Sequence, residues 1–180
     1  DLVLRNNYEQ TLALSLAEGR GLAYLGFEGQ LMRALERRGL LDRKVEALPD
    51  DVALAEREKA GRPLTRPELG VLLAFAKIAL KVDLIAAGVA DDPSLDDELL
   101  SYFPARMAKS WREDIEAHPL RAEIIATRIA NAMINRGGPT YGLRIAERTG
   151  AAPLDIARAY VVVRDAYRLP ELEAGIDALD

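Results

Sequence analysis

The sequence predicts an all-α protein, an irregular multi-helix bundle of about eight or nine helices with no β-sheet. Apolar residues recur at helical spacing, and residues that start or stop helices separate one apolar segment from the next. No segment alternates apolar and polar residues between hairpin turns. The one cluster of β-branched residues, 161–163, falls within a helical series of apolar positions, so we expect it to be helical too.

The N-terminal part of the chain is expected to hold three helices. The first covers residues 2–18 and the second covers residues 27–38, where Gly39 provides the C-terminal stop. A third, charged helix follows. Either Asp50 or Asp51 can accept the hydrogen bonds of its first turn.

A long apolar helix comes next, and its start carries a strong local signal. Thr65 and Glu68 form a capping box, Pro67 lies in the first turn, and the helix is expected to end near Gly88. Because this helix has so little polar surface, we place it at the centre of the bundle. One face differs and carries two small residues, which permit a close helix approach, and two lysines: Gly70, Ala74, Lys77 and Lys81.

The remaining chain contains a series of shorter helices. Prolines or capping residues begin most of them, and the run Gly137-Gly138-Pro139 is a strong stop signal. We expect helices over residues 93–102, 104–117, 119–135, 140–150 and 153–168, and a short terminal helix after Pro170. In the third of these, the residues expected to face inward are Leu120, Ile124, Ile125, Ile129, Ala132 and Met133.

The helix over residues 119–135 also carries an unusual polar stripe. Thr127, Asn131 and Asn135 are spaced four residues apart, with Arg128 beside them. Asparagine is a poor helix former, so two on one stripe require a reason. The stripe either contacts a neighbouring domain or ligand, or forms interhelical hydrogen bonds that fix the register of the bundle, and we favour the second explanation. If the stripe contacts a ligand, Arg136 and the adjacent glycine stop would help to bind a small anion or an amino acid.

Composition excludes several classes of function. Asp and Glu number 29 against 24 Lys and Arg, a net charge of −5, which argues against a nucleic-acid partner. With no cysteine and one histidine, His118, the chain lacks cysteine-based metal sites and thiol nucleophiles. It contains no phosphate-binding loop, no apolar run long enough to span a membrane and no export signal, so a cytoplasmic location is expected. We therefore assign no catalytic, cofactor-binding or metal-binding residue.

The chain is expected to form a single helical domain over residues 1–180. Within it, residues 1–41 can form a helical hairpin packed on a main bundle of residues 63–180. The sequence begins with Asp1 rather than methionine, so we expect a fragment of a much longer chain.

Several strings distributed along the chain match one family in the expected order. The chain resembles the C-terminal helical region of the large bacterial NAD-specific glutamate dehydrogenases. One departure is Glu173, where that family is expected to have a bulky aromatic residue. The strings that carry the resemblance include residues 64–69 (LTRPEL), 71–77 (VLLAFAK), 133–138 (MINRGG) and 176–180 (IDALD).

The resemblance implies a parent enzyme that oxidises L-glutamate with NAD to 2-oxoglutarate and ammonium. The nucleotide-binding fold and acid–base residues of such an enzyme lie upstream, so this segment alone is expected to be inactive and to bind no cofactor. Its implied partners are the catalytic region of the same parent chain and further copies of the parent in a homo-oligomer, with no nucleic acid or membrane. Its expected role is in assembly, support of the catalytic core or regulation.

Two other functions stay open at the level of sequence. The chain could be a helical binding module for an anionic or amino-acid effector. It could also be a free-standing enzyme with a pocket around His118 or perturbed carboxylates. The candidate interface or effector contacts are Lys77, Lys81, Thr127, Arg128, Asn131, Asn135 and Arg136.

Overall fold

The computed structural model describes residues 2–179, except for the side chains of residues 2, 3, 5, 6 and 177, and these residues form the predicted all-α fold. Asp1 and Asp180, the ends of the predicted domain, lie outside the described residues. The helices are α1 (Leu2–Arg20), α2 (Leu22–Arg37), α3 (Asp51–Lys59), α4 (Arg66–Ala86), α5 (Asp96–Leu100), α6 (Ala105–Ser110), α7 (Arg112–Glu116), α8 (Arg121–Gly137), α9 (Tyr141–Thr149), α10 (Pro153–Ala166) and α11 (Leu169–Asp177), with short 3-10 turns at Val89–Asp91 and Pro93–Leu95. Between residues 2 and 179 there is no β-strand.

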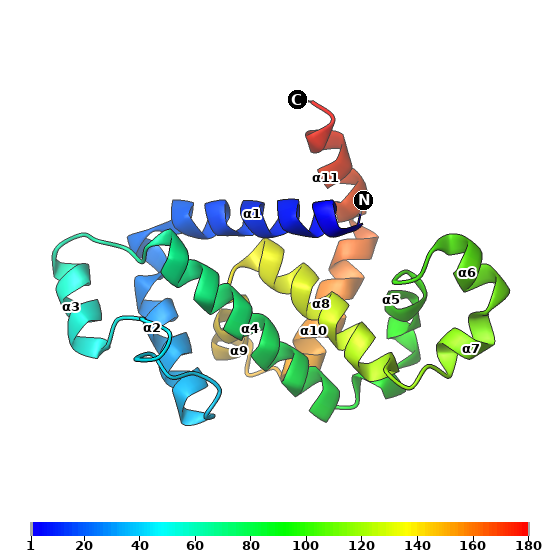
Figure 1. Cartoon of the computed structure of the whole chain (residues 1–180), viewed down its shortest axis with the longest axis horizontal. Coiled ribbons are helices and arrows are strands. Elements are labelled where there is room, and N and C mark those ends of the chain that lie inside the picture. The colour runs from blue at the N-terminus through cyan, green and yellow to red at the C-terminus, as the bar shows by residue number, and fades with distance from the viewer. Residues whose placement is uncertain (1, 180) are drawn as a thin grey trace.

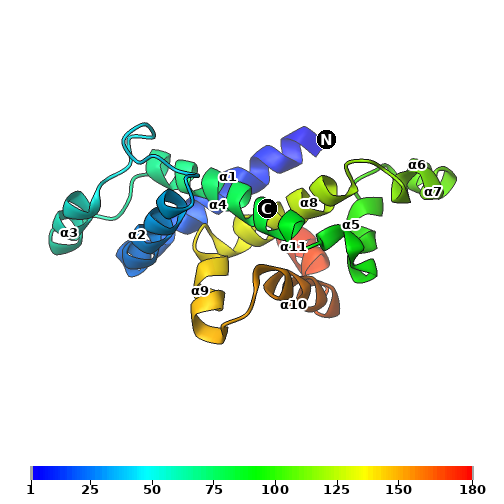
Figure 2. The ribbon, with the colours of Figure 1, turned by 90° about the horizontal axis from the view of Figure 1, so that it is seen from below.

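Helices α4 and α8 form the centre of an elongated molecule, and α1 lies across both (Figure 1). Helices α2 and α3 lie at one end, and α5, α6 and α7 lie at the other. Viewed from below, α9 and α10 lie on the same side of the central helices (Figure 2). The long helices that the sequence predicts therefore form the centre of the fold, and the shortest helices lie at one end.

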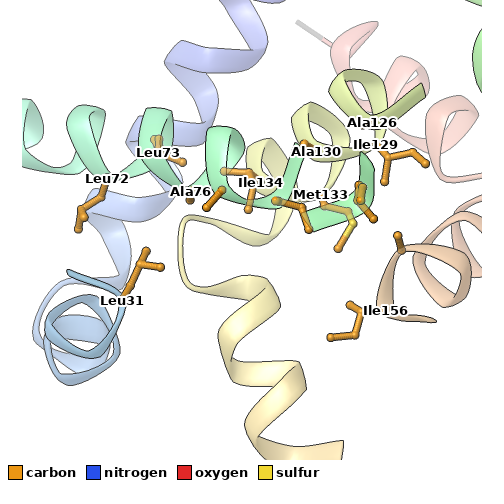
Figure 3. Packing of buried hydrophobic residues seen from close by; sticks show 14 of the residues in the cluster. Leu31, Leu72, Leu73, Ala76, Ala126, Ile129, Ala130, Met133, Ile134 and Ile156 are labelled. Carbon is orange, nitrogen blue, oxygen red and sulfur yellow. The ribbon is translucent and has the colours of Figure 1, made fainter. Parts of the chain in front are cut away.

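The core is built mainly on the contact between α4 and α8. Figure 3 shows Ala76 of α4 beside Ile134 of α8, with Leu72 of α4 and Leu31 of α2 to one side and Met133 of α8 and Ile156 of α10 to the other. Alanines at this contact allow the two helices to approach closely, and the fully buried leucine, isoleucine and methionine side chains fill the space around them. Burying each such side chain contributes about 1.5–3 kcal/mol, so this contact contributes strongly to the stability of the fold.

Local capping interactions mark where α3 and α4 begin. The Glu68 carboxylate accepts hydrogen bonds from the Thr65 backbone N–H at 2.7 Å and from its hydroxyl at 2.8 Å, at the predicted start of α4. At α3, the Asp50 carboxylate accepts a hydrogen bond from Ala53 N at 2.8 Å, so Asp50 rather than Asp51 is the capping residue. These caps satisfy backbone N–H groups that the first turn of a helix leaves without a partner.

The predicted glycine stop after α8 also has a clear structural reason. Gly138 has a φ of +85°, a conformation that side chains other than glycine rarely adopt. A Cβ atom at this position would stand 2.1 Å from Nη1 of Arg20, which donates a hydrogen bond to the Gly137 carbonyl at 2.7 Å. Gly138 therefore ends α8, and the neighbouring Gly137 carbonyl accepts the hydrogen bond of Arg20, the last residue of α1.

Three expectations about individual helices are wrong. The second helix begins at Leu22, immediately after Gly21, rather than at residue 27. The helix expected over residues 104–117 is broken at Trp111, where the backbone leaves helical values (φ −129°, ψ 34°) and the exposed indole gains no burial that would keep the segment continuous. Leu120 precedes α8 and is exposed rather than facing inward.

Candidate functional site

Three of the predicted contact residues meet in one cavity between α1, α4 and α8. Lys77, Asn131 and Asn135 all line it, from two different helices. We call it the three-helix cavity, and its volume is about 170 Å³. Its lining residues are Gln10, Ala13 and Leu14 of α1, Gly70, Leu73, Ala74 and Lys77 of α4, and Asn131 and Asn135 of α8.

Small side chains create the space in this cavity. Ala13 and Ala74 carry only a methyl group, and Gly70 has no side chain. A Cβ atom added at Gly70 would stand 3.7 Å from the nearest atom, Cδ2 of Leu14, which is an ordinary van der Waals contact. The glycine is therefore not required by its backbone. Its effect is to leave the cavity open.

Asn135 is the most unusual residue of the cavity. Its side chain is 5% exposed, and neither Oδ1 nor Nδ2 forms a hydrogen bond with any of the residues that the structure describes. A buried polar group without a partner costs about 1–3 kcal/mol. The register-fixing hydrogen bond that we favoured for this stripe is absent at Asn135 within residues 2–179.

Lys77 faces the same cavity from α4. Burial lowers the pKa of its ammonium group, because removing a charge from water disfavours the charged form, and the nearby Glu9 carboxylate acts in the opposite direction. Lys77 is the one charged side chain among the described residues that line the cavity. The three-helix cavity therefore combines a partly desolvated cation with a buried carboxamide.

The predicted arginines lie outside the three-helix cavity, and each pairs with a carboxylate. Arg128 donates from Nε to Oε2 of Glu98 at 3.3 Å, while Glu98 also pairs with Arg164 at 2.6 Å. Arg136 forms a two-pronged ion pair with Glu173, the residue expected to be aromatic. These pairs join α8 to α5, α10 and α11, so both arginines serve in packing between helices.

The two other predicted contact residues also lie away from the cavity. Thr127 is exposed on α8, and Lys81 is half-buried on α4, one turn beyond Lys77. Neither residue lines the cavity. The structure thus divides the predicted set of seven into three cavity residues, two paired arginines and two residues, one exposed and one half-buried, that lie outside the cavity.

A second, apolar cavity was not anticipated from the sequence. It has a volume of about 190 Å³ and lies among α2, α4, α8, α9 and α10, with Leu35, Ala79, Met133 and Ile156 in its walls. Arg38 and Asp83 form an ion pair at its edge, with Nη2 and Oδ1 2.6 Å apart. Its walls come from five helices, and no pattern within one segment would have revealed it.

An apolar ridge runs along the outer side of α1. Leu4, Tyr8, Leu12 and Leu16 are spaced four residues apart and are all exposed, while Ala13 on the same helix is buried. Residues four apart lie on one face of a helix, so the four side chains form one continuous surface, which we call the α1 ridge. A row of exposed leucines is typical of a surface that another protein segment covers.

No group of three histidine, aspartate or glutamate side chains within residues 2–179 is arranged to hold a metal ion. None of the described helices is both long and apolar enough to cross a membrane.

Comparison with known proteins identifies relatives of much greater length. The family described as "Glutamate dehydrogenase, C-terminal" matches residues 61–180. The chain is 45% identical over 179 residues to the NAD-specific glutamate dehydrogenase of Pseudomonas aeruginosa, covering 99% of this chain and 11% of that protein. It is 42% identical over 180 residues to the enzyme of that name from Halomonas elongata, covering 100% of this chain and 11% of the relative.

A more distant relative agrees with these two. The NAD-specific glutamate dehydrogenase of Mycobacterium tuberculosis is 33% identical over 160 residues, which is 89% of this chain and 10% of that protein. The chain therefore spans about a tenth of the length of the curated relatives that it matches. The resemblance found in the sequence is confirmed, and the chain belongs to the glutamate dehydrogenase family, as its C-terminal domain.

Proposed function

We propose that this chain is a non-catalytic helical domain that packs against the rest of an NAD-dependent glutamate dehydrogenase and supports its assembly. The parent would oxidise L-glutamate with NAD to 2-oxoglutarate and ammonium, as a homo-oligomer in the cytoplasm. The curated relatives are NAD-specific glutamate dehydrogenases about nine times as long as the stretch matched here, which supports a role inside a larger chain. NAD would bind to the parent and not to this domain.

The α1 ridge is the observation that carries the docking role. The inner face of α1 already packs against the bundle, where Ala13 and Ala17 are buried. The outer face presents Leu12 and Leu16 to solvent, and burying each leucine would contribute about 1.5–3 kcal/mol. The remaining nine-tenths of the parent chain is the proposed occupant, because it is covalently attached and therefore present at high effective concentration.

The surroundings of the single histidine support a non-catalytic role. Nδ1 of His118 accepts a hydrogen bond from the backbone N–H of Leu120 at 3.1 Å, and its ring contacts that of Phe103. Both interactions are typical of a histidine that helps to shape a turn between helices. The arginines proposed for an effector site beside the glycine stop are each engaged by a carboxylate, so that alternative has less support than docking.

The docking role can be tested by charging the α1 ridge in the full-length parent. Leu12→Asp places a carboxylate in the middle of the ridge, and we expect it to lower the fraction of assembled enzyme measured by light scattering. The matched control is Val45→Asp, at an exposed apolar residue in the turn before α3. If the two variants assemble equally well and oxidise glutamate at the same rate, the α1 ridge is not the docking surface.

A further inference from the structure

We propose that the three-helix cavity is a binding site for a short-chain monocarboxylate. This proposal goes beyond docking, because it concerns the inner side of α1 rather than the α1 ridge. Three features of the cavity carry it: its volume, the buried amide of Asn135 and the single cation of Lys77.

The volume sets the size of the ligand. Engineered protein cavities of roughly 150 Å³ hold a molecule of the size of benzene, so a cavity of about 170 Å³ accommodates roughly six to eight non-hydrogen atoms. Leu14 and Leu73 line part of the wall, next to the space left by Gly70. A short alkyl group fits against this apolar part. Nucleotides and peptides exceed this volume and would extend past the exposed lining residues Gln10 and Ala74.

The buried amide of Asn135 favours a polar ligand. Its side chain is 95% buried, and both its carbonyl oxygen and its NH2 group are without partners among the described residues. A carboxylate oxygen can accept a hydrogen bond from the NH2 group, as it can from the carboxamides of Asn131 and Gln10, which also line the cavity. The carbonyl oxygen of Asn135 needs a donor instead, which the Lys77 ammonium group or a lining carboxamide NH2 group can supply. A hydrogen bond to a charged acceptor in such surroundings is stronger than one between neutral groups.

Lys77 sets the charge of the ligand. Its ammonium group is partly removed from water, so its attraction to an anion is screened less than it would be at the surface. Lys77 is the one cation among the described lining residues and can balance one negative charge, while the nearby Glu9 carboxylate weakens its attraction to any anion. One carboxylate is therefore matched by the cavity, whereas a dicarboxylate is not.

The first test needs no variant. The chain of 180 residues, labelled with nitrogen-15, is titrated with sodium propionate, and the side-chain amide resonances of Asn131 and Asn135 are followed by NMR. Propionamide has the same shape without the charge, and sodium chloride controls for ionic strength. We expect propionate to shift both resonances with saturation and to bind at least tenfold more tightly than propionamide. Equal affinity of the two molecules, or shifts that sodium chloride reproduces, would overturn the proposal.

Variants of the cavity separate this site from general anion binding. Lys77→Met removes a partly buried charge, so it preserves the fold and is expected to weaken propionate binding at least tenfold. Lys81→Met, one turn further along α4 and outside the cavity, is the matched control and leaves the affinity unchanged. Gly70→Leu fills the cavity and abolishes binding. Equal affinities of the two lysine variants would contradict the proposal, as would unchanged binding by Gly70→Leu.

Discussion

Glu28 of α2 is expected to make the stability of the chain depend on pH in a direction opposite to that of most carboxylates. Its side chain is 3% exposed, and Oε2 has no hydrogen-bond partner among the described residues. Burial raises the pKa of Glu28 from 4.5 to about 7, against the attraction of Arg20 and with a smaller contribution from the charge of Glu68. In the folded chain this carboxyl group therefore keeps its proton up to neutral pH.

The sign of the effect follows from proton binding. Between pH 4.5 and about 7, the folded state holds a proton on Glu28 that the unfolded state has lost. Stability contributed by this group is therefore present at low pH and is lost as the pH rises through this window. The difference between 4.5 and about 7, at about 1.4 kcal/mol per pH unit, corresponds to a loss of about 3 kcal/mol.

Glu28→Gln removes this titration while keeping the shape of the side chain. Urea unfolding followed by circular dichroism at pH 5, 6, 7 and 8 gives the unfolding free energy of each protein. The value for Glu28→Gln minus that for the native chain is expected to grow by about 2–3 kcal/mol from pH 5 to pH 8. Any constant cost of burying the amide cancels in this comparison, and Glu56→Gln on α3 is the exposed control. A difference that stays flat across the pH range would refute the reasoning.

Two further substitutions test the buried ion pair and the core. Arg164→Met removes the closer of the two arginines that pair with the buried Glu98, at 2.6 Å, and leaves Arg128 at 3.3 Å, so it is expected to cost about 2 kcal/mol in urea unfolding, whereas Arg168→Met, in an exposed pair, costs about 0.5 kcal/mol or less. Equal losses would show that Glu98 is not held by Arg164. Leu72→Ala at a fully buried position of α4 is expected to cost about 2–5 kcal/mol in thermal unfolding, and Ile78→Ala, at a residue 46% exposed on the same helix, should cost clearly less. Similar losses at these two positions would contradict the assigned core face of α4.

Local signals in the sequence were sufficient for some helix ends, although they missed the start of α2 and the break at Trp111. The capping pair of Thr65 and Glu68 and the glycine stop at Gly138 each depend on a few neighbouring residues, and both occur where predicted. The ion pair between Arg136 and Glu173 could not be predicted in this way, because the two residues are 37 positions apart. Their contact depends on how α8 and α11 are placed by the rest of the fold.

The difference between local signals and contacts set by the whole fold also explains which candidate residues line the cavity. Helical spacing correctly placed Lys77 beside Gly70, and Asn131 beside Asn135, on common faces. It also placed Lys81 and Thr127 on those faces, yet neither lines the cavity. Each lies one turn further along its helix, about 6 Å away, and a crossing helix of about 10 Å diameter covers only two or three turns of its neighbour. Spacing gives the angle of a residue around the helix axis, but the position of α1 decides where the cavity ends.

Helix α1 connects the two proposals. Its residues Gln10 and Leu14 line the three-helix cavity, Gln10 being exposed and Leu14 half-buried, and its outer residues Leu12 and Leu16 belong to the α1 ridge. A carboxylate in the cavity and a partner on the ridge would both stabilise α1 in its present position. Two ligands that favour the same conformation must strengthen each other's binding by the same factor. Propionate is therefore expected to bind the full-length parent more tightly than the chain of 180 residues, measured by titration calorimetry. Equal affinity in the two proteins would mean that α1 is already fixed by its contacts with α4 and α8, and that the cavity and the ridge act independently.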